Sequence, residues 1–148
     1  MASTPNISAA PVLFKLGEQE FLMSPLTDRD IQELNNFIKQ NILAAAREFC
    51  KSENNINMIN AVMKAAMEQV SKVDWILNSD LLESVERIAY LLWLGVRNNP
   101  PKPSRSDFMQ TLMQDWNENF KICMDTLQLI NPFLLKRVAP EKEDQVPI

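Results

Sequence analysis

Apolar residues recur at spacings of three and four along most of this chain, and no other feature of the sequence constrains the fold as strongly. Such a stripe runs through residues 31–49, 56–77 and 109–130, whereas residues 88–96 are apolar on every side. A three-four spacing turns one face of an α-helix toward a core, and a helix without a polar side belongs in the middle of the packing. The pattern therefore predicts a mainly α fold with a bundle of about four helices.

Capping residues and prolines set the ends of these helices. Thr27 precedes two aspartates in the first turn, which is typical of a helix start. Asp80 and Glu83 resemble a capping pair for the third helix. Residues 99–103 must form a loop, because proline excludes helix at its own position and just before it. After this loop we expect a single fourth helix as far as Ile130.

The apolar residues in the segment before the first helix repeat with a different period from those of the helices. Side chains alternate in character over residues 12–16 and 19–23, and Gly17-Glu18 between them suits a two-residue turn with glycine first. We therefore predict one β-hairpin over residues 12–24. An isolated hairpin is marginal in water, so it must pack on the helices or pair with strands from another chain.

The length of the chain fits one domain, since 148 residues can bury a single hydrophobic core. We expect a single helical domain over residues 12–138, with the hairpin at its N-terminal end. Residues 1–11 are predicted to be a flexible N-terminus and residues 139–148 a flexible C-terminal tail, because both are polar or charged and poor in core residues.

The inventory of catalytic residues is thin. The chain has no histidine, the commonest general base and a common metal ligand, and it has only two glycines, which do not form a phosphate-cradling loop. Its acidic side chains fall on the polar faces of the predicted helices. We therefore expect a protein that is not an enzyme and has no catalytic residue, metal site or cofactor. A small enzyme with converging carboxylates is the remaining catalytic alternative, and it would need acids that face the core.

Charge and the lengths of the apolar runs limit the classes of partner. The net charge is −4 and no long basic cluster is present, which argues against nucleic acid. No apolar run approaches the roughly 18 residues of a membrane span, so we expect no membrane partner. Cys50 and Cys123 lie within apolar helical patterns, which favours buried thiols in a reducing compartment over a disulfide.

Methionine and tryptophan point to protein binding. The chain has eight methionines, and the predicted fourth helix has more apolar surface than one stripe needs. Such a surplus marks a binding surface or an oligomer contact. Core filling by the methionines stays open, as does mutual packing of the second and fourth helices in place of a coiled coil with a partner. The partner-binding candidates are Phe108, Met109, Leu112, Met113, Trp116 and, off the stripe of its own helix, Trp75.

Two stretches of the chain also carry a family resemblance. Residues 14–34 join a short hairpin to a Pro-Leu-Thr helix start and an acidic amphipathic helix. Residues 88–97 contain Leu-Trp-Leu, and residues 101–107 follow with a polar loop and a capped helix start. This order of features resembles that of bacteriophage tail assembly chaperones, and the resemblance covers residues 12–130.

The resemblance implies a non-enzymatic function in virion morphogenesis. A protein of this family binds the phage tape measure protein in the host cytoplasm and helps to deliver it to polymerising tail tube subunits. The family has no residue-level site motif to carry over to this chain. The alternative is a structural component or scaffold protein of the virion, whose hairpin pairs with neighbouring subunits. Homo-oligomerisation stays open in both cases.

Overall fold

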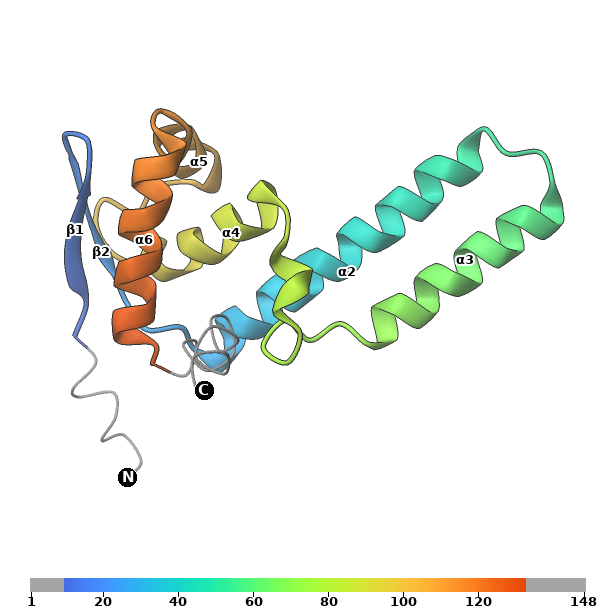
Figure 1. Ribbon diagram of the computed structural model, residues 1–148, viewed down its shortest axis with the longest axis horizontal. Helices are drawn as coiled ribbons and strands as arrows, with labels where there is room; N and C mark the ends of the chain where they lie inside the picture. Colours follow the sequence, from blue (N-terminus) through green and yellow to red (C-terminus); the bar gives the residue numbers. More distant parts are fainter. Residues whose placement is uncertain (1–9, 133–148) are drawn as a thin grey trace, which may run out of the picture.

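A long two-helix arm projects from the rest of the molecule in the computed structural model, which describes residues 10–132 (Figure 1). The predictions for residues 1–9 and 133–148, which include most of the flexible N-terminus and all of the flexible C-terminal tail, lie outside the described residues. In chain order the elements are β1 (Val12–Leu16), β2 (Gln19–Met23), α2 (Asp28–Lys51), α3 (Ile56–Ser71), the 3₁₀ helix η1 (Ser79–Leu82), α4 (Val85–Val96), α5 (Arg105–Met113) and α6 (Trp116–Ile130). The predicted mainly α fold with an N-terminal hairpin is confirmed, with five α-helices in the described residues where about four were expected.

The hairpin forms where the alternation predicts it and packs on the helices. β1 and β2 are antiparallel with Leu16 opposite Gln19, and Gly17 at the turn has a φ of +64°, which glycine adopts without steric cost. The backbone N–H of Ser24 donates to the carbonyl of Gly95 in α4 at 2.8 Å. A Cβ on Gly95 would lie 2.9 Å from Met23 Cγ, so glycine permits this close approach of strand and helix.

The helix that is apolar on every side, α4, lies at the centre of the core as predicted. Its buried residues pack with the inner face of the hairpin and with side chains from the start of α2, from α5 and from α6. The core residues outside α4 include Phe14, Leu16, Phe21, Met23, Leu34, Ile38, Trp75, Leu82, Phe108, Leu112, Cys123 and Leu127. The hydrophobic core therefore lies at the hairpin end of the molecule.

Between α3 and α4 the structure differs from two predictions, the end of the second helix and the start of the third. The second helix ends at Ser71 instead of reaching residue 77, and the third does not begin at an Asp80–Glu83 capping pair. Instead, Asn78 caps the short helix η1, and Ser84 caps α4 by accepting from the backbone N–H of Arg87 at 3.0 Å. The chain leaves the helix here because Trp75 turns into the core, a long-range contact that a local pattern does not contain.

The predicted fourth helix is divided into α5 and α6, and one side chain explains the division. The amide of Asn119 donates to the carbonyls of Thr111 at 3.0 Å and Leu112 at 3.4 Å. In an unbroken helix these carbonyls would accept from the backbone N–H groups of Asp115 and Trp116. Asn119 is buried, so its amide satisfies the end of α5 away from water.

A cluster of charges fastens the end of α4 to the start of α2. The guanidinium of Arg97 donates to Asp30 Oδ1 at 2.7 Å and to Glu33 Oε2 at 3.0 Å, and it also contacts Glu33 Oε1. The hydrogen bond to Glu33 raises the pKa of Arg97, and the same bond lowers the pKa of Glu33 despite the opposing effect of burial. Asp30 also completes a capping box with Thr27, so the predicted helix start and this cluster share one carboxylate.

Candidate binding surface

Three of the six predicted partner-binding residues are core residues, which corrects the sequence-based interpretation. Phe108 and Leu112 of α5 are 1% and 0% exposed, and Trp75 is 0% exposed. Phe108 packs edge-on against Phe21 of the hairpin with ring centroids 5.3 Å apart. The indole N–H of Trp75 donates to the carbonyl of Ile31 at 3.1 Å. None of the three presents surface to a partner in this fold.

The other three predicted residues keep some surface but do not form one arc. Met113 at the end of α5 is 51% exposed, whereas Met109 and Trp116 are half-buried against the core. Trp116 stacks on Phe120 within α6, with ring centroids 5.2 Å apart. The break between α5 and α6 gives the residues on either side of it different directions, so the wide arc of one continuous helix does not exist.

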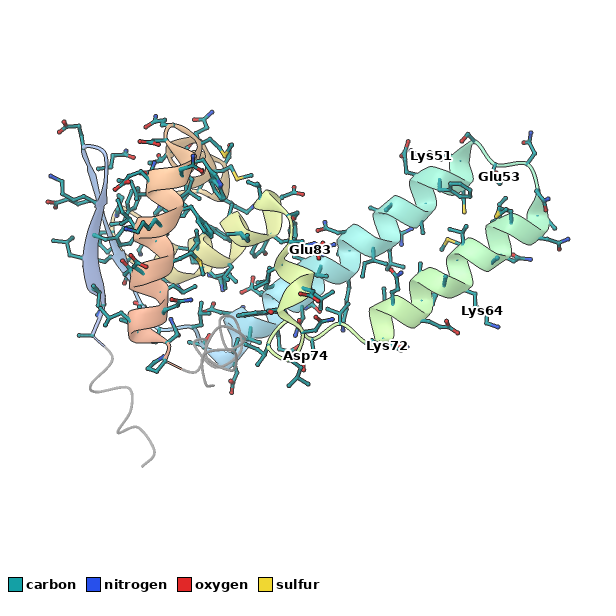
Figure 2. The ribbon with its side chains drawn as sticks, viewed as in Figure 1. Lys51, Glu53, Lys64, Lys72, Asp74 and Glu83 are labelled. Carbon is teal, nitrogen blue, oxygen red and sulfur yellow. The ribbon has the colours of Figure 1, made fainter. Side chains whose placement is uncertain are left out.

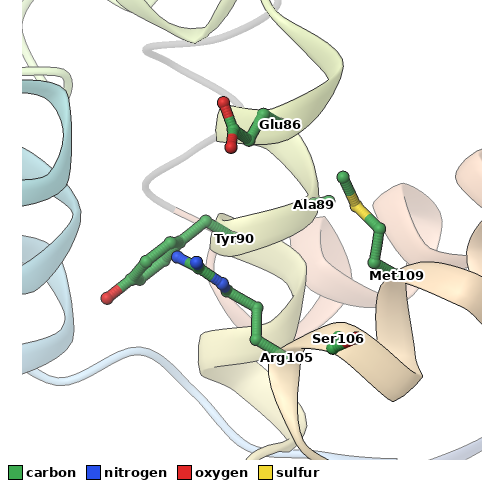
Figure 3. Close-up of a pocket in the computed structure, with 6 residues that line it drawn as sticks. All are labelled: Glu86, Ala89, Tyr90, Arg105, Ser106 and Met109. Atoms are coloured by element: carbon green, nitrogen blue, oxygen red, sulfur yellow. The ribbon is translucent and has the colours of Figure 1, made fainter. Parts of the chain in front are cut away.

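Met109 lines a shallow pocket between α4 and α5 (Figure 3). The pocket has a volume of about 360 Å³, and its lining is completed by Glu86, Ala89, Tyr90, Arg105 and Ser106. The guanidinium of Arg105 lies 4.8 Å from the ring centroid of Tyr90 and 5.1 Å from that of Phe37, so cation–π contacts hold it against the wall. The pocket can take an apolar side chain, but it pairs no nucleophile with a base.

A group of exposed apolar side chains lies on the arm, which we define as residues 43–71. It comprises the second half of α2, the turn to α3, and α3 itself, which run antiparallel away from the body (Figure 1). We use body for residues 10–42 and 72–132. None of the 16 residues of α3 belongs to the core or packs against it, and only Ala66 among them is buried. The arm therefore stands outside the hydrophobic core.

Four of the nine large exposed apolar residues in the described chain lie on this arm. They are Phe49 at 45%, Ile56 at 66%, Met58 at 45% and Met67 at 56% exposed. Ile56, Met63 and Met67 recur after seven and four residues, which places them in one row along α3. The sequence left open whether the methionines fill the core, and Met58 and Met67 do not. Met58, two residues after Ile56, lies off this row, and its spacing in the sequence already indicated that position.

Charge is distributed unevenly between arm and body. The arm carries three basic and three acidic residues, and the body carries nine basic and thirteen acidic residues. Lys51 and Glu53 lie at the free end of the arm, and Lys72 and Asp74 lie where the chain returns to the body (Figure 2). On α2, Lys51 pairs with Glu48 at 3.3 Å. The arm is thus an electrically balanced surface with large apolar side chains.

Potential metal ligands are not clustered in residues 10–132. No cluster of three or more potential metal-ligating residues occurs there. The acidic residues that converge, Asp30 and Glu33, are already engaged by Arg97.

The two cysteines are expected to differ sharply in reactivity. Burial raises the pKa of the Cys123 thiol to about 12, so almost no thiolate exists at neutral pH, whereas Cys50 on the arm is partly exposed. Iodoacetamide at about pH 8 should modify Cys50 and leave Cys123 unmodified in the folded protein. Mass spectrometry of tryptic peptides measures both sites, with urea-unfolded protein as the control in which both react. Equal labelling in the folded state would contradict the burial of Cys123.

Comparison with protein-family models, with curated proteins and with solved structures finds no match to this chain. Among the described residues, no helix is both long enough and apolar enough to cross a membrane.

Proposed function

We propose that this protein is a bacteriophage tail assembly chaperone that binds the tape measure protein without catalysing a reaction, and that the arm is its binding surface. The observation that carries the binding function is the apolar surface of the arm, which no other described part of the chain covers. The phage assignment is supported by the resemblance of the hairpin, the Pro25-Leu26-Thr27 helix start and the Leu-Trp-Leu helix.

The arm suits a helical partner. Two antiparallel helices present rows of apolar side chains, and a third helix laid beside them buries those rows as in a bundle. Met58, Met63 and Met67 contribute unbranched thioether side chains that adapt to partners of different shape. A chaperone that holds successive segments of a long helical protein needs such tolerance. Binding of this kind would shield the apolar segments of a tape measure protein in the host cytoplasm until tail tube subunits polymerise around it.

The arm double variant Ile56→Gln/Met67→Gln is expected to lose the partner while keeping the fold. Both side chains are more than half exposed and neither packs on the core, so stability should change little. Losing two apolar contacts of about 1–2 kcal/mol each should lower recovery of the partner at least tenfold. The measurement is co-expression with the tape measure and tail tube proteins of the same phage, followed by pull-down and quantification.

The matched control is the double variant Leu77→Gln/Leu129→Gln, which replaces two equally exposed leucines of the body. Each is 69% exposed, so the control removes as much apolar surface as the arm variant does. It should retain the partner at the level of the unmodified protein. Equal recovery with both double variants would exclude the arm, and no recovery of either tail protein by the unmodified chain would exclude the chaperone function.

A structural role in the virion is the second candidate, and the hairpin supports it. Leu13 on the outer side of β1 is 57% exposed, and exposed strands can pair with a neighbouring subunit. Mass spectrometry of purified particles separates the two functions, because an assembly chaperone is absent from the finished tail. Stoichiometric recovery of the chain in purified virions would favour the structural role.

A further inference from the structure

We propose that a second copy of this chain covers the arm before the partner binds, and that the two arms form an antiparallel four-helix bundle. The inference rests on the proposed function in one respect, because the tape measure protein would displace the second copy from the same surface. Self-association would then protect the apolar rows in the free protein and release them on binding.

The apolar side chains that the arm leaves exposed could be covered by two further helices. Within the arm, α2 and α3 each bury a single residue, Ala46 and Ala66. Because alanine is small, the two helices can approach closely at these positions, while the larger side chains of Phe49, Ile56 and Met67 remain at the sides. A helix pair with apolar residues beside its contact line becomes stable when a second pair packs on it, as in four-helix bundles. A second copy supplies such a pair.

The size of the arm fits a dimer of moderate affinity. The 16 residues of α3 span about 24 Å and the part of α2 in the arm about 14 Å, so two helices of about 10 Å diameter make a face of about 380 Å² in projection. Stable interfaces bury about 800 Å² per partner, and the relief of the side chains makes the accessible area larger than the projection. We therefore expect a dissociation constant in the micromolar range, about 1–100 µM, which a partner protein can overcome.

The charges favour a second copy over an acidic or basic partner in the free state. Each arm has three basic and three acidic residues, so two arms meet without net repulsion. Each body carries nine basic and thirteen acidic residues, and bodies side by side would repel. Antiparallel arms hold the two bodies at opposite ends, about 24 Å or more apart, beyond the Debye length of about 10 Å at 0.1 M salt. Dimer affinity should therefore change less than threefold between low and high salt.

Sedimentation equilibrium of the purified full chain tests the proposal. Over about 1–300 µM protein, the mean mass should rise from 17.0 kDa toward twice that value. The variant Ile56→Gln/Met67→Gln should remain near the monomer mass, with a circular dichroism spectrum like that of the unmodified chain. The control Leu77→Gln/Leu129→Gln should dimerise normally. Alkylation of Cys50, a thiol on the arm, should slow as the protein concentration rises, and should stay fast in the arm variant.

Two results would overturn the proposal. One is a monomer at every concentration, and the other is a dimer that the arm variant leaves intact. Both results concern the free chain alone, so they are independent of the pull-down with tail proteins. If the chain is a monomer that still retains tape measure protein through the arm, only the proposed dimer is contradicted. If the chain forms the dimer but retains no tail protein, only the proposed chaperone function is contradicted.

Discussion

Replacing Trp75 with alanine is expected to lower the free energy of unfolding by about 3–5 kcal/mol. The indole is fully buried in the hydrophobic core beside α2, and its removal leaves a cavity there. The substitution also removes the hydrogen bond from the indole N–H to the carbonyl of Ile31. Urea unfolding followed by circular dichroism measures the change.

The matched control for this prediction is Trp116→Ala. Trp116 is half-buried and stacks on Phe120 at the surface of α6, so its loss should cost about 1–2 kcal/mol. The contrast tests the corrected role of Trp75. If Trp75→Ala unfolded like the unmodified chain but bound its partner weakly, Trp75 would be the exposed anchor that the sequence suggested.

The second large effect is expected for Arg97→Ala, which should lower the free energy of unfolding by about 2–4 kcal/mol. The side chain of Asp30 is 8% exposed and that of Glu33 33% exposed, so removal of Arg97 leaves one carboxylate buried without a cation. The surface pair is the control, because both Lys51 and Glu48 are about three-quarters exposed. Lys51→Ala should change stability by less than about 0.5 kcal/mol. Equal effects would contradict the buried character of the cluster.

The pH dependence of stability gives a second readout for Arg97. The hydrogen bond from Arg97 holds the pKa of Glu33 below its unfolded value of about 4.3. The contribution of Glu33 is therefore fully present above that value and is lost as the pH falls through the lower folded pKa. Stability of the unmodified chain should decline below about pH 5, and in Arg97→Ala the part of this decline due to Glu33 should be absent.

Local pattern was a reliable guide where both partners of an interaction lie close in sequence. The glycine-first turn at Gly17, the capping box of Thr27 and Asp30, and the placement of the apolar helix α4 in the core all follow from neighbouring residues. The same reasoning failed at the break between α5 and α6. There a buried amide of Asn119 reaches back to carbonyls seven and eight residues earlier, and no periodicity reports such a bond.

The candidate site was harder to predict than the fold. The predicted binding residues Phe108, Leu112 and Trp75 are apolar in the way that Ile56 and Met67 are, yet the first three are buried and the other two are exposed. Side-chain chemistry does not distinguish the two groups. What distinguishes them is whether another element packs over them, and within residues 10–132 the element that packs extensively on α3 is α2.

The sequence by itself determined that this chain is helical with one hairpin, where its first helix starts, and that it lacks histidine chemistry. The tertiary structure alone decided which apolar faces are covered, because coverage depends on contacts between distant segments. Trp75 is brought into the core by contacts with Ile31 and Asn35, about forty residues away. Ile56 and Met67 of α3 stay exposed because no other element of residues 10–132 packs over them.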